Sequence, residues 1–344
     1  EIKCEVQWET LLAETASIAM ASEAGSTSKF LVGGVEVAAI LDAEYAKIRA
    51  RFGLADDFLS AFDFEKMEQG GGKGGQVMGF TKEYLYIIKE LNASDHATLL
   101  KIAGDYATHI LGADGSLLAR FFLHFEHKGK RFTVMNNWMP PPNYEKATDL
   151  KLSFDLQKNY SQYDLKGCAD DKTLKLKGKK IEAVHKRIFN IKLWLGETFW
   201  TAERRHYFLG KVHAKRTTFP VSKEDYAQIM KQVKRDVEFL QDKGLMDYSL
   251  VVAMHALPKT ADNVADLVYR GTSDGGAQPY IGTSANQICV VYVGIIDFLQ
   301  NWTAAKEIAN KIKCLETNKA TIQPVPYGDR FKKYLASKFE PSCQ

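Results

Sequence analysis

The chain has 344 residues, of which 45% are apolar, and a formal net charge of +4. A chain of this length and composition can bury one large core or two coupled cores, so we expect a globular protein with two lobes or domains. The small net charge does not indicate a nucleic-acid binder. The longest apolar stretch, residues 288–296, is far shorter than the roughly 20 residues that a membrane-spanning helix needs.

The cysteines indicate a reducing compartment. They are few, widely spaced and include no C-x-x-C pair, which argues against a disulfide framework or a structural zinc site. The N-terminal residues contain scattered acids and no sustained apolar region, so they do not form a secretory signal. We therefore expect a cytoplasmic protein. The chain does not begin with Met, which suggests a piece of something larger.

A glycine-rich stretch, GGGKGG at residues 70–75, precedes a predicted β-hairpin over residues 76–91. Residues at every second position of a strand point to the same face. In the second strand Lys89 therefore shares its face with three apolar residues: Leu85, Ile87 and Leu91. This is an unusual setting for a lysine.

A helix and two strands complete the first lobe. Helical spacing of apolar residues predicts a helix with Ser94 as its N-cap and Gly112 just past its end. Two predicted strands, 117–127 and 131–137, follow. The three prolines at 140–142 end regular structure. We place the boundary between the lobes there, which gives a first lobe at residues 1–139 and a second lobe at residues 140–344.

The second lobe contains the clearest helix signal in the chain. Ser222 and Asp225 form a capping-box pattern, and helical spacing continues until Gly244. Two apolar strands, 248–254 and 288–299, are predicted on either side of a long polar loop. Asp247 precedes the first strand and Asp297 lies near the end of the second. Each acid stands beside an otherwise apolar run.

A carboxylate buried without a partner costs several kcal/mol, so Asp247 and Asp297 are expected to meet a cation, a metal or backbone donors. For either acid alone, a strand-end Asp bonded to nearby backbone is an open alternative. The glycine stretch could likewise be a flexible linker. The order of glycine loop, lysine and two acids nevertheless matches what phosphoryl transfer needs. The HRD, DFG and APE motifs of protein kinases are absent, which disfavours that family.

These residues resemble the phosphatidylinositol phosphate kinase family. MDYSL at 246–250, GIIDFLQ at 294–300 and YDLKG at 163–167 are similar to its catalytic signatures, and the similarity extends from about Gly70 to Phe339. The resemblance implies an α+β, two-lobed kinase-like fold, with an antiparallel sheet in the N-terminal lobe and a mixed α/β C-terminal lobe. One departure is Cys168, which replaces the Ser that follows this lysine-glycine pair in the family.

The resemblance also implies roles for single residues, with ATP and Mg2+ as cofactors. Asp247 would orient and deprotonate the inositol hydroxyl, Asp297 would bind the metal, and Lys89 would contact the α/β-phosphates. Lys166 would lie near the phosphates, although surface charge is an alternative for it. The remaining implied nucleotide ligands belong to the glycine loop and the adenine pocket: Gly72, Lys73, Gly74, Gly75, Asn137 and Met139. A strand-end turn is the alternative for Asn137.

Residues 171–187 are rich in Lys and Arg and contain few acids. They could form a solvated loop. If the substrate is a phosphoinositide in an anionic membrane, however, each cation near the bilayer contributes about 1 kcal/mol to docking. We expect peripheral membrane association through Lys177, Lys179 and Lys180. The family contains dimers, so a homodimer is possible.

Three functions compete at this point. The first is a lipid kinase that makes a phosphatidylinositol bisphosphate from a monophosphate and ATP. The second is a non-catalytic phosphoinositide-binding scaffold, and the third is a soluble inositol phosphate kinase. Ala309 resembles the position that is Ala in phosphatidylinositol 5-phosphate 4-kinases and Glu in 4-phosphate 5-kinases, which favours a 4-kinase. Ala309 also has helical spacing with neighbouring apolar residues, so inward packing is the alternative.

Overall fold

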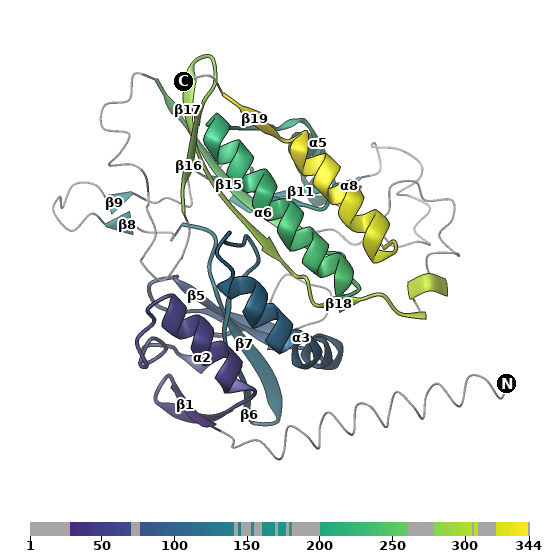
Figure 1. Cartoon of the computed structure of the whole chain (residues 1–344). Helices are drawn as coiled ribbons and strands as arrows, with labels where there is room; N and C mark the ends of the chain where they lie inside the picture. The colour runs from purple at the N-terminus through teal and green to yellow at the C-terminus, as the bar shows by residue number, and fades with distance from the viewer. Residues whose placement is uncertain are drawn as a thin grey trace. The chain divides into compact units, whose positions relative to one another are not determined.

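A computed structural model of the chain (Figure 1) describes residues 28–69, 76–140, 144–145, 153–154, 160–168, 171–176, 179–180, 200–259, 268, 278–304, 306–308 and 321–342. The chain divides into two compact units. Unit 1 comprises Glu1–Lys82, Tyr86–Leu111 and Arg120–Asn136, and unit 2 comprises Glu83–Leu85, Gly112–Ala119 and Asn137–Gln344. Two short segments, Glu83–Leu85 and Gly112–Ala119, belong to unit 2 although they precede Asn136 in the sequence. The division into units therefore does not follow a single boundary in the chain. Among the described helices, none is long and apolar enough to cross a membrane.

Unit 1 is built on a seven-stranded antiparallel sheet in the order β1-β2-β6-β7-β5-β4-β3. Its central hairpin, β6–β7, turns at Lys128 and Gly129, both of which have positive φ angles. Its strands are β1 (Ser28–Val32), β2 (Val35–Ala39), β3 (Glu68–Gln69), β4 (Val77–Phe80), β5 (Tyr86–Leu91), β6 (Phe121–His127) and β7 (Lys130–Asn136).

Two helices pack with this sheet, α2 (Asp42–Arg51) and α3 (Ala93–Leu111), and a short 3-10 helix, η1 (Phe64–Lys66), precedes β3. The apolar stripe predicted for α3 is buried. The predicted N-cap was wrong: Asn92, not Ser94, accepts the backbone N–H of Asp95, at 2.8 Å. An Asn side chain satisfies a first-turn N–H as well as Ser does, and it starts the helix earlier.

Unit 2 contains a six-stranded sheet in the order β12-β11-β10-β15-β17-β16. Its neighbouring strands are antiparallel, and the longest pair, β15 and β17, stays in register from Ser249 opposite Ile296 to Pro258 opposite Gln287. The strands of this sheet are β10 (Ser161–Leu165), β11 (Lys172–Leu176), β12 (Lys179–Lys180), β15 (Ser249–Pro258), β16 (Tyr280–Thr283) and β17 (Gln287–Ile296).

Shorter strand pairs and three long helices complete the described part of unit 2. The pairs are β8 (Tyr144–Glu145) with β9 (Ser153–Phe154), β13 (Phe219–Val221) with β19 (Phe339–Pro341), and β14 (Leu245–Met246) with β18 (Gln300–Asn301). The helices are α5 (Ala202–Arg216), α6 (Lys223–Asp242) and α8 (Pro324–Ala336). Both units therefore combine helices with mainly antiparallel sheets.

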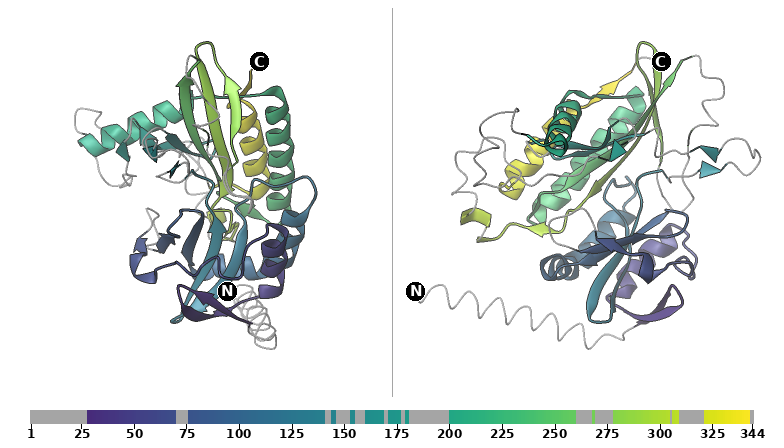
Figure 2. Two further views of the ribbon diagram at one scale, coloured as in Figure 1. Left: turned by 90° about the vertical axis from the view of Figure 1, so that its left-hand side faces the viewer. Right: turned by 180° about the vertical axis from the view of Figure 1, so that it is seen from behind.

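Helices α6 and α8 lie side by side (Figures 1 and 2). The predicted cap of α6 is confirmed, since the Ser222 hydroxyl accepts the N–H of Asp225 at 3.0 Å. The predicted end is confirmed by Gly244, whose φ is +70°. The helices approach closely at Gly328, where an added Cβ would lie 2.7 Å from Val237 Cγ1. Helix α8 also packs on β14, the short strand that ends one residue before Asp247.

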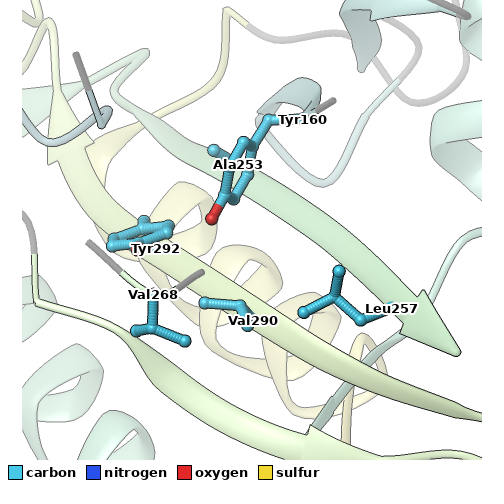
Figure 3. Close-up of a cluster of buried hydrophobic side chains, with 6 residues drawn as sticks. All are labelled: Tyr160, Ala253, Leu257, Val268, Val290 and Tyr292. Atoms are coloured by element: carbon cyan, nitrogen blue, oxygen red, sulfur yellow. The ribbon is translucent and has the colours of Figure 1, made fainter. Parts of the chain in front are cut away.

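A cluster of buried side chains forms part of the core around β15 and β17 (Figure 3). Its members come from four segments of unit 2 and are Tyr160, Ala253, Leu257, Val268, Val290 and Tyr292. Met139, Ile281 and Ile288 pack against it. These aromatic and aliphatic side chains bury the strands on which the candidate site is built.

Candidate functional site

Asp247 and Asp297 occupy equivalent places in an interrupted antiparallel ladder. The pairing of β15 with β17 stops at Ser249 and Ile296 and resumes in β14 and β18, where Met246 faces Gln300. Both acids lie in the gap, and both have left-handed backbone, with φ of 65° and 58°. Asp and Asn tolerate this conformation better than most residues with a Cβ. The interruption therefore places both acids between the β15–β17 pair and the β14–β18 pair.

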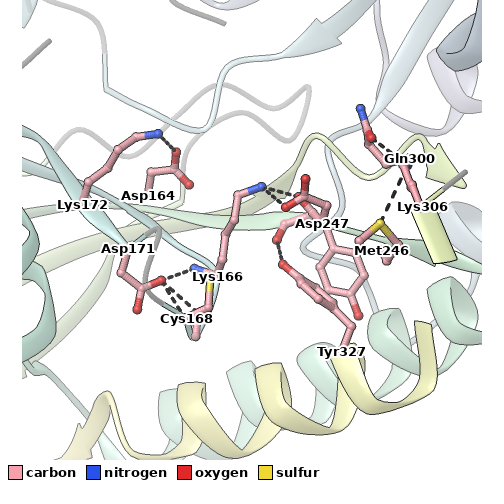
Figure 4. Close-up of polar contacts among 12 residues, drawn as sticks. Asp164, Lys166, Cys168, Asp171, Lys172, Met246, Asp247, Gln300, Lys306 and Tyr327 are labelled. Carbon is pink, nitrogen blue, oxygen red and sulfur yellow. Dashed lines mark hydrogen bonds and ion pairs between the residues drawn. The ribbon is translucent and has the colours of Figure 1, made fainter. Parts of the chain in front are cut away.

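Lys166 lies at the end of β10, the neighbouring strand, where Leu165 pairs with Leu250. Its Nζ donates to Asp247 Oδ1 at 2.6 Å and also to the Asp247 carbonyl (Figure 4). Burial alone would lower the pKa of Lys166, but the charges of Asp247, Asp164 and Asp297 raise it above its ordinary value. The lysine is thus held as a cation among three carboxylates, and its interpretation as surface charge is wrong.

A second carboxylate organises the backbone that follows Lys166. Asp171 Oδ1 accepts the N–H groups of Lys166, Gly167 and Cys168 at 2.5, 2.9 and 3.4 Å. Gly167 has a φ of +68°, and an added Cβ there would lie 3.0 Å from Tyr334 Cβ. Burial raises the pKa of Asp171 above its ordinary value, while the amide hydrogen bonds oppose that rise. The turn is therefore built around one buried acid.

The residues next to Asp247 are supported from α8. The Tyr327 hydroxyl donates to the Tyr248 carbonyl, and the two rings meet edge to face with centroids 4.7 Å apart. Phe331 adds a further edge contact to Tyr248, at 5.0 Å. Because Tyr248 and Tyr327 are fully buried, this aromatic cluster restricts the backbone beside Asp247.

The strand that leads to Asp297 is held through a different helix. Asp236 of α6 accepts the Ser116 hydroxyl at 2.8 Å and the Leu117 N–H at 2.7 Å. The Leu117 carbonyl in turn accepts the N–H of Ile295 at 2.6 Å. This chain of hydrogen bonds ends two residues before Asp297. It also explains why β6 begins at Phe121 rather than at residue 117, since Leu117 and Leu118 pair with Ile295 instead.

Lys89 belongs to unit 1, whereas Lys166, Asp247 and Asp297 belong to unit 2. It lies in β5, where it pairs with Met78 of β4 and Thr133 of β7. Lys89 and Ile87 are half-buried, whereas Tyr86 and Ile88 face the core. Lys89 therefore emerges on the less buried face of its sheet. The glycine loop residues Gly72, Lys73, Gly74 and Gly75 lie outside the described residues.

Asn137 and Met139 follow β7. Asn137 is buried, and its side chain donates to the Tyr84 carbonyl at 2.8 Å and accepts the Met139 N–H at 3.0 Å. Its own N–H donates to the Leu85 carbonyl at 2.8 Å. Asn137 thus joins residues 84–85 to Met139 within unit 2, and Met139 packs on the buried cluster of Figure 3. This network defines the segment that was expected to bind adenine.

The positions assigned to specificity and docking are only partly described. Ala309 and Lys177 lie outside the described residues, whereas Lys179 and Lys180 form β12, which pairs with β11. Lys306 has a defined role: its Nζ donates to Gln300 Oε1 at 2.9 Å and to the Asn301 carbonyl at 2.6 Å (Figure 4). It therefore stabilises β18, just beyond Asp297.

The donor set fits a magnesium ion that is bound together with a nucleotide. Among the residues that the structure describes, no three His, Cys, Asp or Glu side chains gather into a metal site. Mg2+ is commonly held by only one or two carboxylates together with phosphate oxygens. Asp297, which follows the end of β17, is a carboxylate of this kind.

Comparison with known proteins identifies the family. Residues 63–278 and 268–338 match the family described as phosphatidylinositol-4-phosphate 5-kinase. The chain belongs to this family. The resemblance seen in the sequence motifs is thereby confirmed, and the match spans the segments that carry Lys89, Lys166, Asp247 and Asp297.

Similar curated proteins include kinases of both phosphoinositide specificities. Phosphatidylinositol 4-phosphate 5-kinase its3 of Schizosaccharomyces pombe is 24% identical, covering 79% of this chain and 41% of its own length. Phosphatidylinositol 5-phosphate 4-kinase type-2 gamma of Danio rerio is 22% identical, covering 86% of this chain and 75% of its own length. Phosphatidylinositol 4-phosphate 5-kinase 1 of Arabidopsis thaliana is 21% identical, covering 78% and 40%. The chain spans about two fifths of the length of the yeast and plant relatives.

Sequence reasoning missed three residues that shape this site, namely Asp171, Asp236 and Tyr327. Asp236 had a signal, because it falls on the buried stripe of α6 at helical spacing. Asp171 had none, since its role depends on a turn that closes through backbone N–H groups. Tyr327 also had no local signal, because the residue that it contacts, Tyr248, lies 79 residues earlier in the sequence.

Proposed function

We propose that this chain is an ATP-dependent lipid kinase that transfers the γ-phosphate of ATP to a phosphatidylinositol monophosphate. The observation that carries the proposal is the arrangement of Lys166, Asp247 and Asp297. Two carboxylates and one half-buried ammonium group stand at the ends of three neighbouring strands. A scaffold that only binds lipid headgroups would gain nothing from carboxylates here, because they repel phosphate.

Asp247 is assigned to the attacking hydroxyl of the inositol ring. Its carboxylate would accept the hydroxyl proton as the oxygen attacks the γ-phosphorus, while the bond from that phosphorus to the β–γ bridging oxygen breaks. The contact with Lys166 at 2.6 Å fixes the orientation of the Asp247 carboxylate. Lys166 also supplies positive charge where the transferred group carries negative charge.

The remaining roles concern the nucleotide. Asp297 would hold Mg2+, which neutralises the phosphate oxygens when it is bound with ATP. Lys89 is assigned to the α/β-phosphates, and Gly72, Lys73, Gly74 and Gly75 to the loop that covers them. Asn137 would position the segment that contacts adenine, and Met139 would form part of the adenine pocket. These assignments rest on the family membership and on the order of the residues along the chain.

The experiment measures transfer of radiolabelled phosphate from ATP to phosphatidylinositol monophosphate in vesicles and to soluble inositol phosphates. We expect transfer to the lipid. Asp297→Asn should nearly abolish transfer, and Asp247→Asn should lower turnover about 10²- to 10⁴-fold with nucleotide binding retained. Asp242→Asn, at a side chain that is 71% exposed, is the matched control.

Other outcomes separate the alternatives. A wild-type chain that binds the lipid but transfers no phosphate would be a scaffold. Transfer to soluble inositol phosphates alone would make it a soluble inositol phosphate kinase. Loss of folding in Asp247→Asn, measured by circular dichroism, would make Asp247 a structural residue.

The finer assignment is to phosphatidylinositol 5-phosphate, with attack by the 4-hydroxyl. Ala309 supports it, since a Glu at this position would place negative charge beside the lipid phosphates and select another ring orientation. The named relatives include both 4-kinases and 5-kinases. Each monophosphate is therefore presented in otherwise identical vesicles. Faster phosphorylation of the 4-phosphate lipid would overturn the 4-kinase assignment and leave the kinase proposal standing.

A further inference from the structure

Helix α5 is attached firmly to unit 2 along one side only. It packs on β11, and within the helix Gly210 and Ala214 are the buried residues. Its C-terminal end is fixed by Lys338, whose buried Nζ donates to the carbonyls of Ala214, Lys215 and Thr217 at 2.7, 2.7 and 2.8 Å. Figure 2 shows α5, in teal, standing apart from the pair formed by α6 and α8.

The opposite side of the helix is largely exposed and carries both apolar and basic side chains. Residues at positions i, i+3, i+4, i+7 and i+11 share one helix face, and here they form the outer face of α5: Arg205, Phe208, Leu209, Val212 and Arg216. Phe208 is 39% exposed and Leu209 is 53% exposed. Leu209 therefore points away from the protein core, and Phe208 is exposed on one side while its ring meets that of Trp200 edge to face at 5.1 Å.

Cations surround these apolar side chains. The helix carries five Lys and Arg residues and a single carboxylate, Glu203. Arg205, Lys215 and Arg216 are exposed, and they form no ion pair with any acid in the described part of the chain. Helix α5 is therefore basic around an apolar centre.

The cations on the flank of the helix are arranged differently. Arg204 lies over the rings of Trp200 and Tyr207, at 5.4 and 5.9 Å, and Lys211 lies over Tyr207 at 4.9 Å. These aromatic contacts hold Arg204 and Lys211 beside the outer face of α5 rather than on it. The outer face therefore lies on a helix whose C-terminal end is fixed by Lys338 and whose flanking cations are held by aromatic rings.

We propose that the outer face of α5 docks on an anionic lipid bilayer, with Phe208 and Leu209 entering the headgroup region and Arg205 and Arg216 contacting anionic headgroups. This inference rests on the proposed function, which places the substrate in such a bilayer. A basic face with an apolar centre is the pattern of helices that lie in a membrane interface. Helix α5 packs on β11, and β11 pairs with β12, so the docking face belongs to the same part of unit 2 as this hairpin.

A bilayer fits this face better than an acidic protein does. A stable protein interface buries about 1,200 Å² or more around a packed apolar centre, whereas two exposed apolar side chains on one helix offer much less. Weak insertion that is assisted by several cations suffices for a membrane, because each cation near an anionic leaflet adds about 1 kcal/mol to binding.

The test is sedimentation of the chain with phosphatidylcholine vesicles, with and without phosphatidylserine. The variant Phe208→Ser/Leu209→Ser should bind the phosphatidylserine vesicles about tenfold more weakly. Arg205→Gln/Arg216→Gln should bind several-fold more weakly and with a smaller dependence on salt. Val325→Ser, which removes an apolar side chain that is 57% exposed on α8, is the matched control and should bind normally.

Kinase assays distinguish this inference from the proposed function. Phosphate transfer to a short-chain, water-soluble phosphatidylinositol monophosphate should be unchanged in the α5 variants, while transfer to the vesicle lipid should fall with binding. Unchanged vesicle binding in both α5 variants would overturn the inference. So would capture of polyglutamate through α5 without vesicle binding, which would indicate an acidic protein partner. Absence of transfer to either lipid would refute the proposed function, and the vesicle-binding result would remain valid by itself.

Discussion

Asp171 is the residue on which the geometry of Lys166 depends. A buried carboxylate needs donors, and here three successive N–H groups supply them at 2.5 to 3.4 Å. The same hydrogen bonds fix the backbone of the turn just after β10. Because Lys166 reaches Asp247 from this turn, a small rotation of the backbone would move its Nζ away from the 2.6 Å contact. Asp171 is therefore a positioning residue for Lys166.

The variant Asp171→Asn tests this role. The amide keeps the size of the side chain but removes the charge that strengthens the three hydrogen bonds. We expect turnover to fall about tenfold, the equivalent of about 1.4 kcal/mol, with the KM for ATP little changed.

The pH dependence separates positioning from a loss of stability. Because the pKa of Asp171 is raised, its carboxylate is protonated at a higher pH than that of an ordinary Asp, and activity should begin to fall there on acidification. Asp171→Asn should lack that part of the decline, since the amide does not titrate. A variant with wild-type turnover and an unchanged pH profile would contradict the role, and Asp242→Asn again serves as the exposed control.

At the scale of elements, α6 connects the interior of unit 2 to the strand end that carries Asp297. Asp236 receives two donors, one from the Ser116 hydroxyl and one from the Leu117 N–H. The neighbouring Arg235 donates to the Gly115 carbonyl. One turn of α6 thus holds residues 115–117 in place, and the Leu117 carbonyl accepts the N–H of Ile295.

We expect Asp236→Asn to weaken this connection. An amide presents one oxygen and one NH2 group, so the NH2 group would face a donor and leave one buried hydrogen bond unmade, at a cost of about 1–3 kcal/mol in unfolding free energy. Chemical denaturation measures this loss. Turnover should fall as well, because the strand end at Asp297 becomes less ordered.

A milder variant calibrates the result. Ser116→Ala removes the hydroxyl that donates to Asp236 and accepts the Leu118 N–H at 3.0 Å, but it leaves the Leu117 N–H bond at 2.7 Å intact, so its effect on turnover should be smaller. Equal effects of the two variants would argue against a role for the Asp236–Leu117 bond.

At the scale of the whole molecule, local signals in the sequence predicted the long elements. The capping of α6 by Ser222 and the buried stripe of α3 depend on neighbouring residues alone, so both can be predicted from the sequence. The paired placement of Asp247 and Asp297 was not readable, because it depends on the register of β15 with β17 and on a gap in that ladder. The joining of residues 112–119 to unit 2 was equally hidden, since Asp236 lies more than a hundred residues further along the chain.

The buried histidine pair of unit 1 predicts how stability depends on pH. His124 is fully buried, and its Nε2 lies 2.9 Å from His96 Nδ1. Burial, together with the nearby His96 and Arg131, lowers the pKa of His124 to about 3, and these causes include no counterion. Glu126 acts on His96, whose pKa is lowered mainly by burial.

The sign of the effect follows from proton binding. At pH values between about 6.5 and 3, an unfolded His124 binds a proton that the folded protein excludes, so the free energy of unfolding falls as the pH falls. Above pH 6.5 the residue is neutral in both states and contributes no pH dependence. The expected loss between pH 8 and pH 5 is about 2 kcal/mol from His124 alone. Denaturant titrations at a series of pH values measure this loss. The variant His124→Gln does not titrate at this position, so it should reduce the slope of unfolding free energy against pH. The control His206→Gln, at an exposed site, should retain that slope. An undiminished slope in His124→Gln would show that other groups govern the acid sensitivity of the fold.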